Sequence, residues 1–312
     1  MKKFDQYVRH LRILSRAFDE DLTNDFIVSG IIDKYYIQFE LGWKVLKELL
    51  RYEGANQAAT GSPREIIKTP AQIEGIKASA KINTGALDLV AKNIKAGMST
   101  AEIDKLVHDF TVAQGAIPAP LNYQGFPKSC CTSINDEICH GIPSEDVILK
   151  DGDIINVDVS TILNGYFSDA SRMFKIGAVH PELDKLVDVA KECLDCGLKA
   201  AKPWGFMGDI AEAVQKHAES NGYSVVREFG GHGIGLQFHE DPFVSHVGKA
   251  GTGMLLVPGM TFTIEPMINM GTPDLFIDAD NDWTALTEDG YPSAQWEYTI
   301  LITEDGAEIL TY

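Results

Sequence analysis

The sequence predicts an α+β domain preceded by a short all-helical module, and three observations support this division. Apolar residues recur at helical spacing up to about residue 68, after which helical and strand-like segments alternate. The charge changes at the same place: residues 1–68 carry 11 Lys/Arg against 10 Asp/Glu, whereas the remainder carries 16 against 35. Beyond residue 68 the order helix, helix, strands occurs twice, which indicates an internal duplication. Strands joined largely by hairpins and covered by helices are typical of α+β domains.

The helical module is predicted to contain two helices and a short stub. Apolar residues spaced three and four apart predict helices at about 4–18 and 25–53. Gly54 is the expected stop of the second helix, because glycine readily adopts the left-handed conformation that ends many helices.

Two helix-start signals a few residues apart mark the boundary between the two parts. Ser62 and Thr69 are each followed by proline and, three positions on, by Glu or Gln, which is the pattern of a capping box with proline at the first helical position. Pro70 disfavours a helical conformation at Thr69, so the helix that begins at Ser62 is only a turn or two long. We therefore predict one domain at 1–66 and a second at 67–312.

The elements of the second domain follow from the same kinds of signal. Ser99 with Glu102 gives another capping box, and glycines at 97, 115 and 222 are expected helix stops. Helices are therefore expected at about 70–95, 100–114, 181–200 and 208–221, and strands near 129–139, 153–160, 166–175, 224–229, 233–238, 261–269 and 296–303.

Composition limits the class of protein. No stretch reaches the roughly 18–20 apolar residues of a membrane span, and the charged start lacks the apolar core of a secretion signal, so a cytoplasmic protein is expected. The net charge of −18 disfavours nucleic-acid binding and favours cationic ligands such as free amino termini and metal ions. Five unevenly spaced cysteines argue against a disulfide framework, and Cys193 and Cys196 are interpreted as ordinary helix residues.

A hairpin is predicted to bring two aspartates together. Asn164-Gly165, the dipeptide most favoured in two-residue hairpin turns, separates two strand-like segments. With those two residues as the loop, Ser160 faces Asp169. Asp158 then faces Ser171, so that the two aspartates lie on one face as diagonal neighbours, within reach of a shared cation. The alternative is a pair of solvent-facing carboxylates on an edge hairpin.

His232, Glu265 and Glu297 complete a candidate set of five metal ligands. Four nearby glycines let the backbone around His232 approach a ligand closely, and both glutamates lie in apolar strand-like runs where a carboxylate needs a counter-charge. Each glutamate alone could be a salt-bridge partner, but Lys and Arg are nearly absent from these segments, so metal ions are the simpler counter-charge. One imidazole and four carboxylates suit two divalent cations bridged by carboxylates better than a structural zinc.

Two further histidines occupy similar settings. His140 lies in Cys139–Pro143 and His239 lies in Phe238–Pro242, although a single histidine of this kind is more often structural than catalytic. The other five histidines, at 10, 108, 180, 217 and 246, are expected to be surface or packing residues.

Eight short motifs follow one another between about residue 67 and residue 312. They are Gly125–Ser129, Cys139–Pro143, Asn156–Val159, Ser168–Arg172, Gly231–Gly235, Phe238–Pro242, Thr263–Met267 and Ser293–Glu297. In sequence and in order they resemble the type I methionine aminopeptidase family, whose members have the pita-bread (creatinase/aminopeptidase) metallopeptidase fold. This resemblance implies that fold, with its pseudo-two-fold duplication, for the second domain.

The resemblance also implies a division of the five ligands between two metal ions. Asp158, Asp169 and Glu297 are expected to hold one ion. Asp169, His232, Glu265 and Glu297 are expected to hold the other, so Asp169 and Glu297 would bridge the pair.

Catalytic and substrate-binding roles are implied in the same way. His140 is expected to bond the scissile nitrogen, His239 the carbonyl oxygen, and Glu265 is expected to carry a proton to the leaving amine. Besides the two histidines, the residues expected to bind a methionine side chain are Tyr123, Phe126, Cys131, Phe238 and Trp283. Pro120 and Tyr298 depart from the family, where a cysteine and a histidine are usual, and this leaves pocket shape and the hydrogen bonding behind the metals open.

The function implied is a metalloaminopeptidase that removes the initiator methionine from nascent proteins during protein maturation, with a small second residue preferred. A water activated by two divalent ions (Mn, Fe, Co or Zn) would attack the scissile carbonyl. The expected partner is the N-terminal methionine of nascent polypeptides, met near the ribosome, with no stable nucleic-acid or membrane binding. An X-Pro aminopeptidase of the same fold and a non-catalytic pita-bread binding protein are the alternatives.

A second resemblance concerns the helical module. Segments Phe39–Lys47, Tyr52–Gly54 and Ala59–Glu65 are similar to the nucleotidyltransferase substrate-binding family, a helical-bundle partner of minimal nucleotidyltransferases. The likeness covers about the first half of that family's domain. Two helices and a stub cannot by themselves bury an apolar face that includes Phe39 and Trp43. We therefore hypothesise that this face packs on the catalytic domain or on its copy in a second chain, which would give a homodimer.

Overall fold

The chain divides into two compact units, Met1–Arg64 and Glu65–Tyr312. The computed structural model describes residues 2–19, ten positions between 27 and 45, and residues 66–312; the ten positions are 27, 30, 31, 34, 35, 37, 38, 42, 44 and 45. In the first unit, helix α1 (Lys2–Leu14) is followed by a 3-10 turn, η1 (Ser15–Asp19). Most of the second predicted helix, its stop at Gly54 and the start signal at Ser62 lie outside the described residues.

The second unit consists of two pairs of helices and fifteen strands, with one 3-10 turn, η3 (Tyr123–Gly125), among its described residues. The helices are α4 (Pro70–Asn93), α5 (Thr100–Ala113), α6 (Pro181–Ala200) and α7 (Met207–Ser220). The strands are β1 (Ile117–Pro118), β2 (Cys131–Ile134), β3 (Glu137–Cys139), β4 (Ile154–Leu163), β5 (Tyr166–Lys175), β6 (Ser224–Val225), β7 (Gly231–Gly233), β8 (Glu240–Val244), β9 (Thr261–Ile264), β10 (Met267–Asn269), β11 (Leu275–Ile277), β12 (Ala285–Thr287), β13 (Ser293–Gln295), β14 (Tyr298–Ile302) and β15 (Ala307–Ile309).

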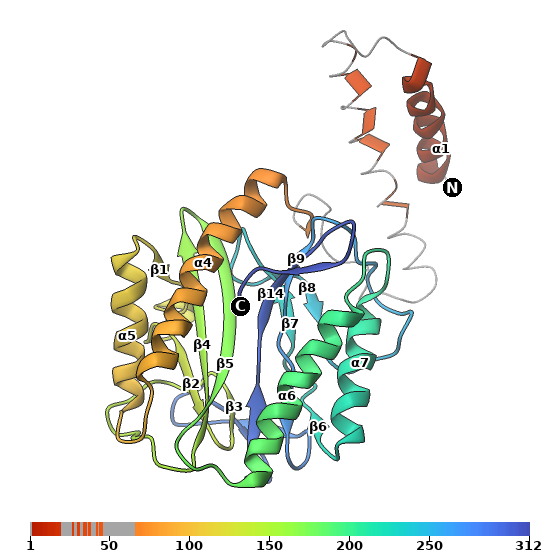
Figure 1. The fold of residues 1–312 in the computed structure, drawn as a ribbon. Coiled ribbons are helices and arrows are strands. Elements are labelled where there is room, and N and C mark those ends of the chain that lie inside the picture. The colour runs from red at the N-terminus through yellow and green to blue at the C-terminus, as the bar shows by residue number, and fades with distance from the viewer. Residues whose placement is uncertain are drawn as a thin grey trace. The chain divides into compact units, whose positions relative to one another are not determined.

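Each helix pair covers its own group of strands, so the predicted alternation of helices and strands is present (Figure 1). Helix α4 packs on β4 and β5, and one buried apolar cluster contains Leu87 of α4, Ile103 of α5 and Val157 of β4. Helices α6 and α7 cover the second group, where Val214 and Ile268 belong to one buried cluster. No helix in the described part of the chain is long and apolar enough to cross a membrane.

Local signals in the sequence specify the starts of the first helix pair. The capping boxes at Thr69 and Ser99 are both formed, because each side chain accepts from the backbone N–H three positions on and the Gln72 or Glu102 side chain bonds back. Together they fix where α4 and α5 begin.

The predicted hairpin between β4 and β5 is formed in the predicted register. Asn164 and Gly165 both have positive φ, 52° and 82°, as the favoured two-residue hairpin turn requires. Ser160 pairs with Asp169, and Asp158 pairs with Ser171. The two aspartates are therefore diagonal neighbours on one face.

The strands after residue 222 differ from the prediction at several places: β8, β11, β12, β13 and β15 were not predicted, the strand expected at 224–229 ends at Val225, and the strand expected at 261–269 is divided into β9 and β10. The expected strand at 233–238 is wrong, since β7 ends at Gly233 and the chain then bends. Gly235 has a φ of 141°, which only glycine adopts readily, so the extended run is broken there. Strand β7 instead lies in a five-stranded sheet of order β15-β14-β9-β7-β8, beside the strand that leads to Glu265.

Candidate metal centre

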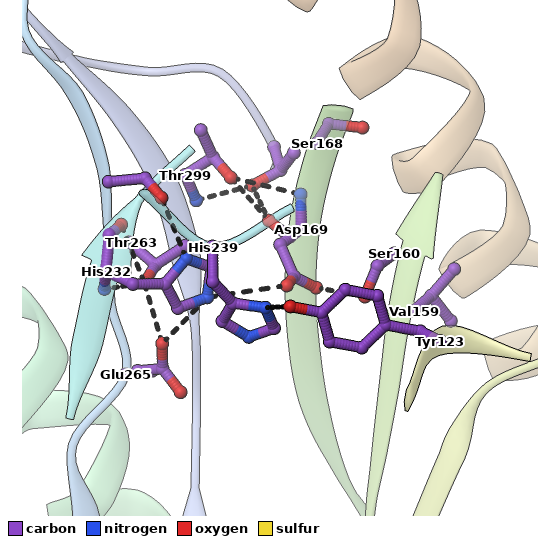
Figure 2. A network of polar contacts seen from close by, with 12 residues as sticks. Tyr123, Val159, Ser160, Ser168, Asp169, His232, His239, Thr263, Glu265 and Thr299 are labelled. Carbon is purple, nitrogen blue, oxygen red and sulfur yellow. Dashed lines mark hydrogen bonds and ion pairs between the residues drawn. The ribbon is translucent and has the colours of Figure 1, made fainter. Parts of the chain in front are cut away.

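The five predicted ligands come from segments far apart in the sequence, and Figure 2 shows three of them, Asp169, His232 and Glu265, close together. Asp158 and Asp169 lie on the β4–β5 hairpin, His232 lies on β7, Glu265 directly follows β9 and Glu297 directly precedes β14. Asp169, His232 and Glu297 each offer a ligand atom within 4.8 Å of the others. Nε2 of His232 is 3.8 Å from Oδ2 of Asp169 and 3.6 Å from Oε1 of Glu265. Asp158 is the diagonal neighbour of Asp169 across the hairpin.

The carboxylates of this cluster are placed where their negative charge is unfavourable. Burial raises the pKa of Asp158 to about 6 and that of Glu265 to about 8. Burial and then the neighbouring carboxylates hold the pKa of Asp169 and of Glu297 well above their usual range. Within the described residues, both carboxylate oxygens of Glu297 and Oδ1 of Asp158 lack a hydrogen-bond partner. Buried acids with free oxygens need a cation.

His232 is oriented so that one ring nitrogen is free. Its Nδ1 lies 3.0 Å from the carbonyl oxygen of Gly233, so Nδ1–H donates and Nε2 keeps its lone pair for a ligand. Burial, with His239 next, lowers the pKa of His232 to about 3, so the ring is neutral. Gly231 and Gly233 allow neighbouring backbone to approach, since a Cβ at either would lie about 2 Å from a carbonyl oxygen. The glycine signal in the sequence thus reflects close strand packing.

Several side chains that hold the ligands were not predicted from the sequence. Ser160 donates to Oδ1 of Asp169 at 2.7 Å, and Thr263 donates to Oε1 of Glu265 at 2.6 Å. His246, which the sequence indicated only as a surface or packing residue, is buried and accepts from the backbone N–H of Glu265 at 3.1 Å. Ser160 faces Asp169 across the predicted hairpin and Thr263 lies two positions before Glu265, but the sequence does not indicate that their hydroxyls bond these carboxylates, nor that His246 bonds the backbone of Glu265.

A cavity of about 610 Å³ opens beside the cluster. All the residues predicted to bind substrate line it, namely Tyr123, Phe126, Cys131, His140, Phe238, His239 and Trp283. Pro120 also lines it, and so do Gln124, Glu228, Phe229, Phe243 and Met267, which were not predicted. The ring of Tyr123 lies edge-on to Phe238, and the ring of Phe126 lies edge-on to Trp283. The wall opposite the acids is therefore largely aromatic and apolar.

His239 and His140 lie on the wall of the same cavity. Nδ1 of His239 is 3.0 Å from the hydroxyl of Tyr123, and its ring lies 4.2 Å from that of His232. Desolvation and then His140 lower the pKa of His239 to about 4, and desolvation also lowers the pKa of His140. His140 has a φ of 58°, an unusual conformation for histidine that is often found at functional sites. Both rings are thus neutral hydrogen-bonding groups.

Tyr298, which was predicted to depart from the family pattern, has its ring against Tyr312 and Lys191. Its ring is buried, stacks on Tyr312, and lies 4.9 Å from Nζ of Lys191. Glu297, next to it in the chain, is almost fully buried. The departure therefore changes packing behind the strand and leaves the ligand set intact.

Comparisons with known proteins agree with this site. Residues 74–304 match the family model described as Metallopeptidase family M24. Residues 2–86 match the model Nucleotidyltransferase substrate binding protein like, so the resemblance predicted for the first module is confirmed, and this match continues into α4. Methionine aminopeptidase A of Synechocystis is 52% identical over 240 residues, which cover 77% of this chain and 94% of the relative.

Solved structures lead to the same fold. A crystal structure of methionine aminopeptidase from Rickettsia prowazekii superposes with a TM-score of 0.77 at 44% identity, covering 79% of this chain and 99% of that one. An X-Pro aminopeptidase from Thermotoga maritima superposes with a TM-score of 0.62 at 24% identity, covering 80% and 63%, and shares the fold alone. The predicted α+β pita-bread fold is confirmed.

Proposed function

Because the chain belongs to metallopeptidase family M24, we propose that it removes the N-terminal methionine from polypeptides by means of two divalent metal ions. Five residues of the type that such ions prefer carry this proposal: Asp158, Asp169, His232 and Glu265 line a cavity that also has aromatic side chains in its wall, and Glu297 is buried next to Asp169 and His232. In the proposed assignment Asp169 and Glu297 would contribute to holding both ions, Asp158 would contribute to one of them, and His232 and Glu265 would contribute to the other.

The metal pair, when bound, supplies an activated water near neutral pH and polarises the scissile carbonyl. Glu265 receives the proton of the attacking water on one of its carboxylate oxygens and passes it to the leaving amine nitrogen. Its Oε1 accepts from Thr263 and its Oε2 from Gln295, so the carboxylate keeps its orientation while it holds the proton.

The two cavity histidines orient the peptide bond. The Tyr123 hydroxyl donates to Nδ1 of His239, which leaves Nε2–H as the donor to the scissile carbonyl oxygen and to the negative charge that develops there. His140 bonds the scissile nitrogen. Because both rings are neutral, they donate hydrogen bonds without placing further positive charge beside the metal ions.

The shape and charge of the cavity favour methionine at the first position. Aromatic rings and Cys131 provide a surface suited to a flexible thioether. The acidic cluster is suited to the free α-amine, which explains removal of a single residue. A short side chain is expected at the second position, because the ring of Phe229 borders the cavity next to His140.

A substrate panel tests this function. Purified full-length chain, stripped with EDTA and reloaded with Mn²⁺, should release methionine from Met-Ala-Ser and should leave Ala-Pro-Ala intact. Chelator should abolish the release. Preference for the X-Pro peptide would favour the X-Pro aminopeptidase, and no release from any peptide by the metal-loaded protein would favour a non-catalytic binding protein.

The identity of the metal is a separate question, because carboxylate-rich sites accept several divalent ions. We propose that Mn, Fe, Co and Zn all bind and that cellular supply selects among them. Elemental analysis of protein purified without added metal, followed by rate measurements after reloading with each ion, decides which ion supports turnover.

The first unit is proposed to be a separate domain, residues 1–66, that mediates homodimerisation. Its predicted helices, two and a short stub, cannot by themselves bury the apolar face that includes Phe39 and Trp43. Light scattering of the full chain should give a dimeric mass, and a monomeric mass would exclude the dimer.

Action on nascent chains is a separate proposal, and co-sedimentation of the protein with translating ribosomes would test it.

A further inference from the structure

Two threonines on neighbouring strands lie side by side behind the metal ligands (Figure 2). Thr263 on β9 is paired with Thr299 on β14, and both side chains are fully buried. Each lies two positions from a glutamate of the cluster, in the mirrored order Thr263-x-Glu265 and Glu297-x-Thr299. Residues two apart share a face of a strand, so the threonine pair and the glutamate pair are placed on one face of the ladder.

Thr299 holds the backbone of Asp169 at both of its polar groups. Its hydroxyl accepts from the N–H of Asp169 at 3.1 Å and donates to the carbonyl oxygen of Asp169 at 2.7 Å. Two residues away on each strand, the N–H of Glu297 donates directly to the carbonyl oxygen of Ser171. At Asp169, therefore, the hydroxyl of Thr299 links β14 to β5 in place of a direct backbone hydrogen bond.

Thr263 does the same for His232. Its hydroxyl accepts from the N–H of His232 at 2.9 Å, and it donates to Oε1 of Glu265 at 2.6 Å. One hydroxyl thus joins the backbone of one predicted ligand to the carboxylate of another. A buried backbone N–H needs an acceptor. Loss of the Thr299 hydroxyl would remove the acceptor of the Asp169 N–H, and loss of the Thr263 hydroxyl would remove that of the His232 N–H.

We propose that Thr263 and Thr299 are a matched pair of positioning residues that fix His232 and Asp169 to the ladder carrying the two glutamates. Four ligands are thereby held as one unit before a metal ion arrives. The inference rests on the proposed function only in taking these residues as metal ligands. Groups that orient metal ligands typically change affinity by about 10–100-fold when they are removed.

Valine has the shape of threonine without its hydroxyl, so the test uses full-length T299V and T263V, with T299S and T263S as hydroxyl-retaining variants. Binding of Mn²⁺ to the EDTA-treated proteins is measured by calorimetry. We expect T299V to bind Mn²⁺ about 10-fold more weakly and T263V to lose more, up to about 100-fold, because Glu265 also loses a hydrogen bond. Both serine variants should bind nearly as the wild type does.

Thr287 provides the matched control. It is a buried threonine whose hydroxyl donates to the carbonyl oxygen of Tyr291 at 2.8 Å, in a turn that contains none of the five ligands. T287V should lower the melting temperature like the other valine variants and leave Mn²⁺ affinity unchanged. If a valine variant does not fold, the alanine variant at the same position is measured instead.

The outcomes separate this inference from the proposed activity. The positioning role would be overturned if wild type, T299V and T263V bound Mn²⁺ with equal affinity. It would also be overturned if T287V lost as much Mn²⁺ affinity as T299V and T263V do. Wild-type protein that binds Mn²⁺ tightly and releases no methionine would overturn the proposed activity and leave the positioning role standing. Wild-type protein that binds no Mn²⁺ would overturn both.

Discussion

The catalytic unit contains two kinds of buried acid, and they obtain their counter-charge in different ways. Glu240, next to His239 in the chain, lies 2.7 Å from Nζ of Lys68, with side-chain exposures of 8% and 0%. In the metal cluster, by contrast, the carboxylate oxygens of Glu297 have no hydrogen-bond partner among the described residues, and burial raises the pKa of Glu265 to about 8.

This difference distinguishes a structural acid from a ligand. Where the chain supplies its own cation, as at Lys68 and Glu240, the pair fixes the turn that bears His239. Where several acids are buried together without such a cation, the site is completed by ions from solution.

Removal of a metal ligand should have the largest effect. D158N and H232A each take away a donor that the chain cannot replace, so hydrolysis of Met-Ala-Ser should be abolished. Chromatographic measurement of released methionine checks this, with calorimetry of Mn²⁺ binding on the same preparations. Wild-type rates in either variant would sink the ligand assignment.

Removal of the internal cation should act on stability. K68M leaves Glu240 buried without its counter-charge, and breaking a buried pair in this way typically costs about 3–5 kcal/mol of unfolding free energy. Urea denaturation of the EDTA-treated protein measures the loss. The double variant K68M/E240Q removes both charges and should recover most of the lost unfolding free energy. Equal stability of wild type and K68M would show that Lys68 does not serve as the structural counter-charge of Glu240.

The contrast also explains which parts of the molecule the sequence could predict. The β4–β5 hairpin was predicted with its register because one local dipeptide, Asn164-Gly165, specifies both the turn and the pairing. The caps at Thr69 and Ser99 were predictable for the same local reason. The four acidic candidates were visible as charges in strand-like segments, and His232 was visible by the glycines around it.

The remainder depends on contacts between segments far apart. The strand expected at 233–238 failed because Gly235 leaves the extended conformation to let the chain turn beside Lys68, whose Cε would lie 3.1 Å from an added Cβ. Thr263 and Thr299 look like ordinary strand residues in the sequence, and His246 looks like a surface or packing histidine. Their importance appears only when β5, β7, β9 and β14 are brought together.

Metal-free protein should lose stability as pH rises, and metal should reverse this. The pKa of Asp158 is raised from 3.8 to about 6 and that of Glu265 from 4.5 to about 8. Between those values the folded state binds more protons than the unfolded state, so the stabilising contribution is present below about pH 4 and is lost as pH rises towards 8. Because Mn²⁺ competes with these protons, the rise in melting temperature on adding Mn²⁺ should be greater at pH 8 than at pH 5.5. A rise that is the same at both values, measured by scanning calorimetry, would contradict a buried acid cluster that exchanges protons for metal.

The smallest effect should come from Tyr123, which touches neither kind of acid. Y123F keeps the aromatic wall of the cavity and removes only the hydroxyl that bonds Nδ1 of His239 at 3.0 Å. A hydrogen bond of this kind contributes about 0.5–1.5 kcal/mol, so kcat for Met-Ala-Ser should fall by up to about 10-fold while KM and Mn²⁺ affinity stay near the wild-type values. F126Y is the control, because it keeps an aromatic ring in the cavity wall and changes that wall at Trp283, away from His239. It should change KM and leave kcat largely unchanged. If Y123F instead raises KM with kcat unchanged, Tyr123 acts only as a pocket wall, and the orientation of His239 depends on the Lys68–Glu240 pair at its neighbour.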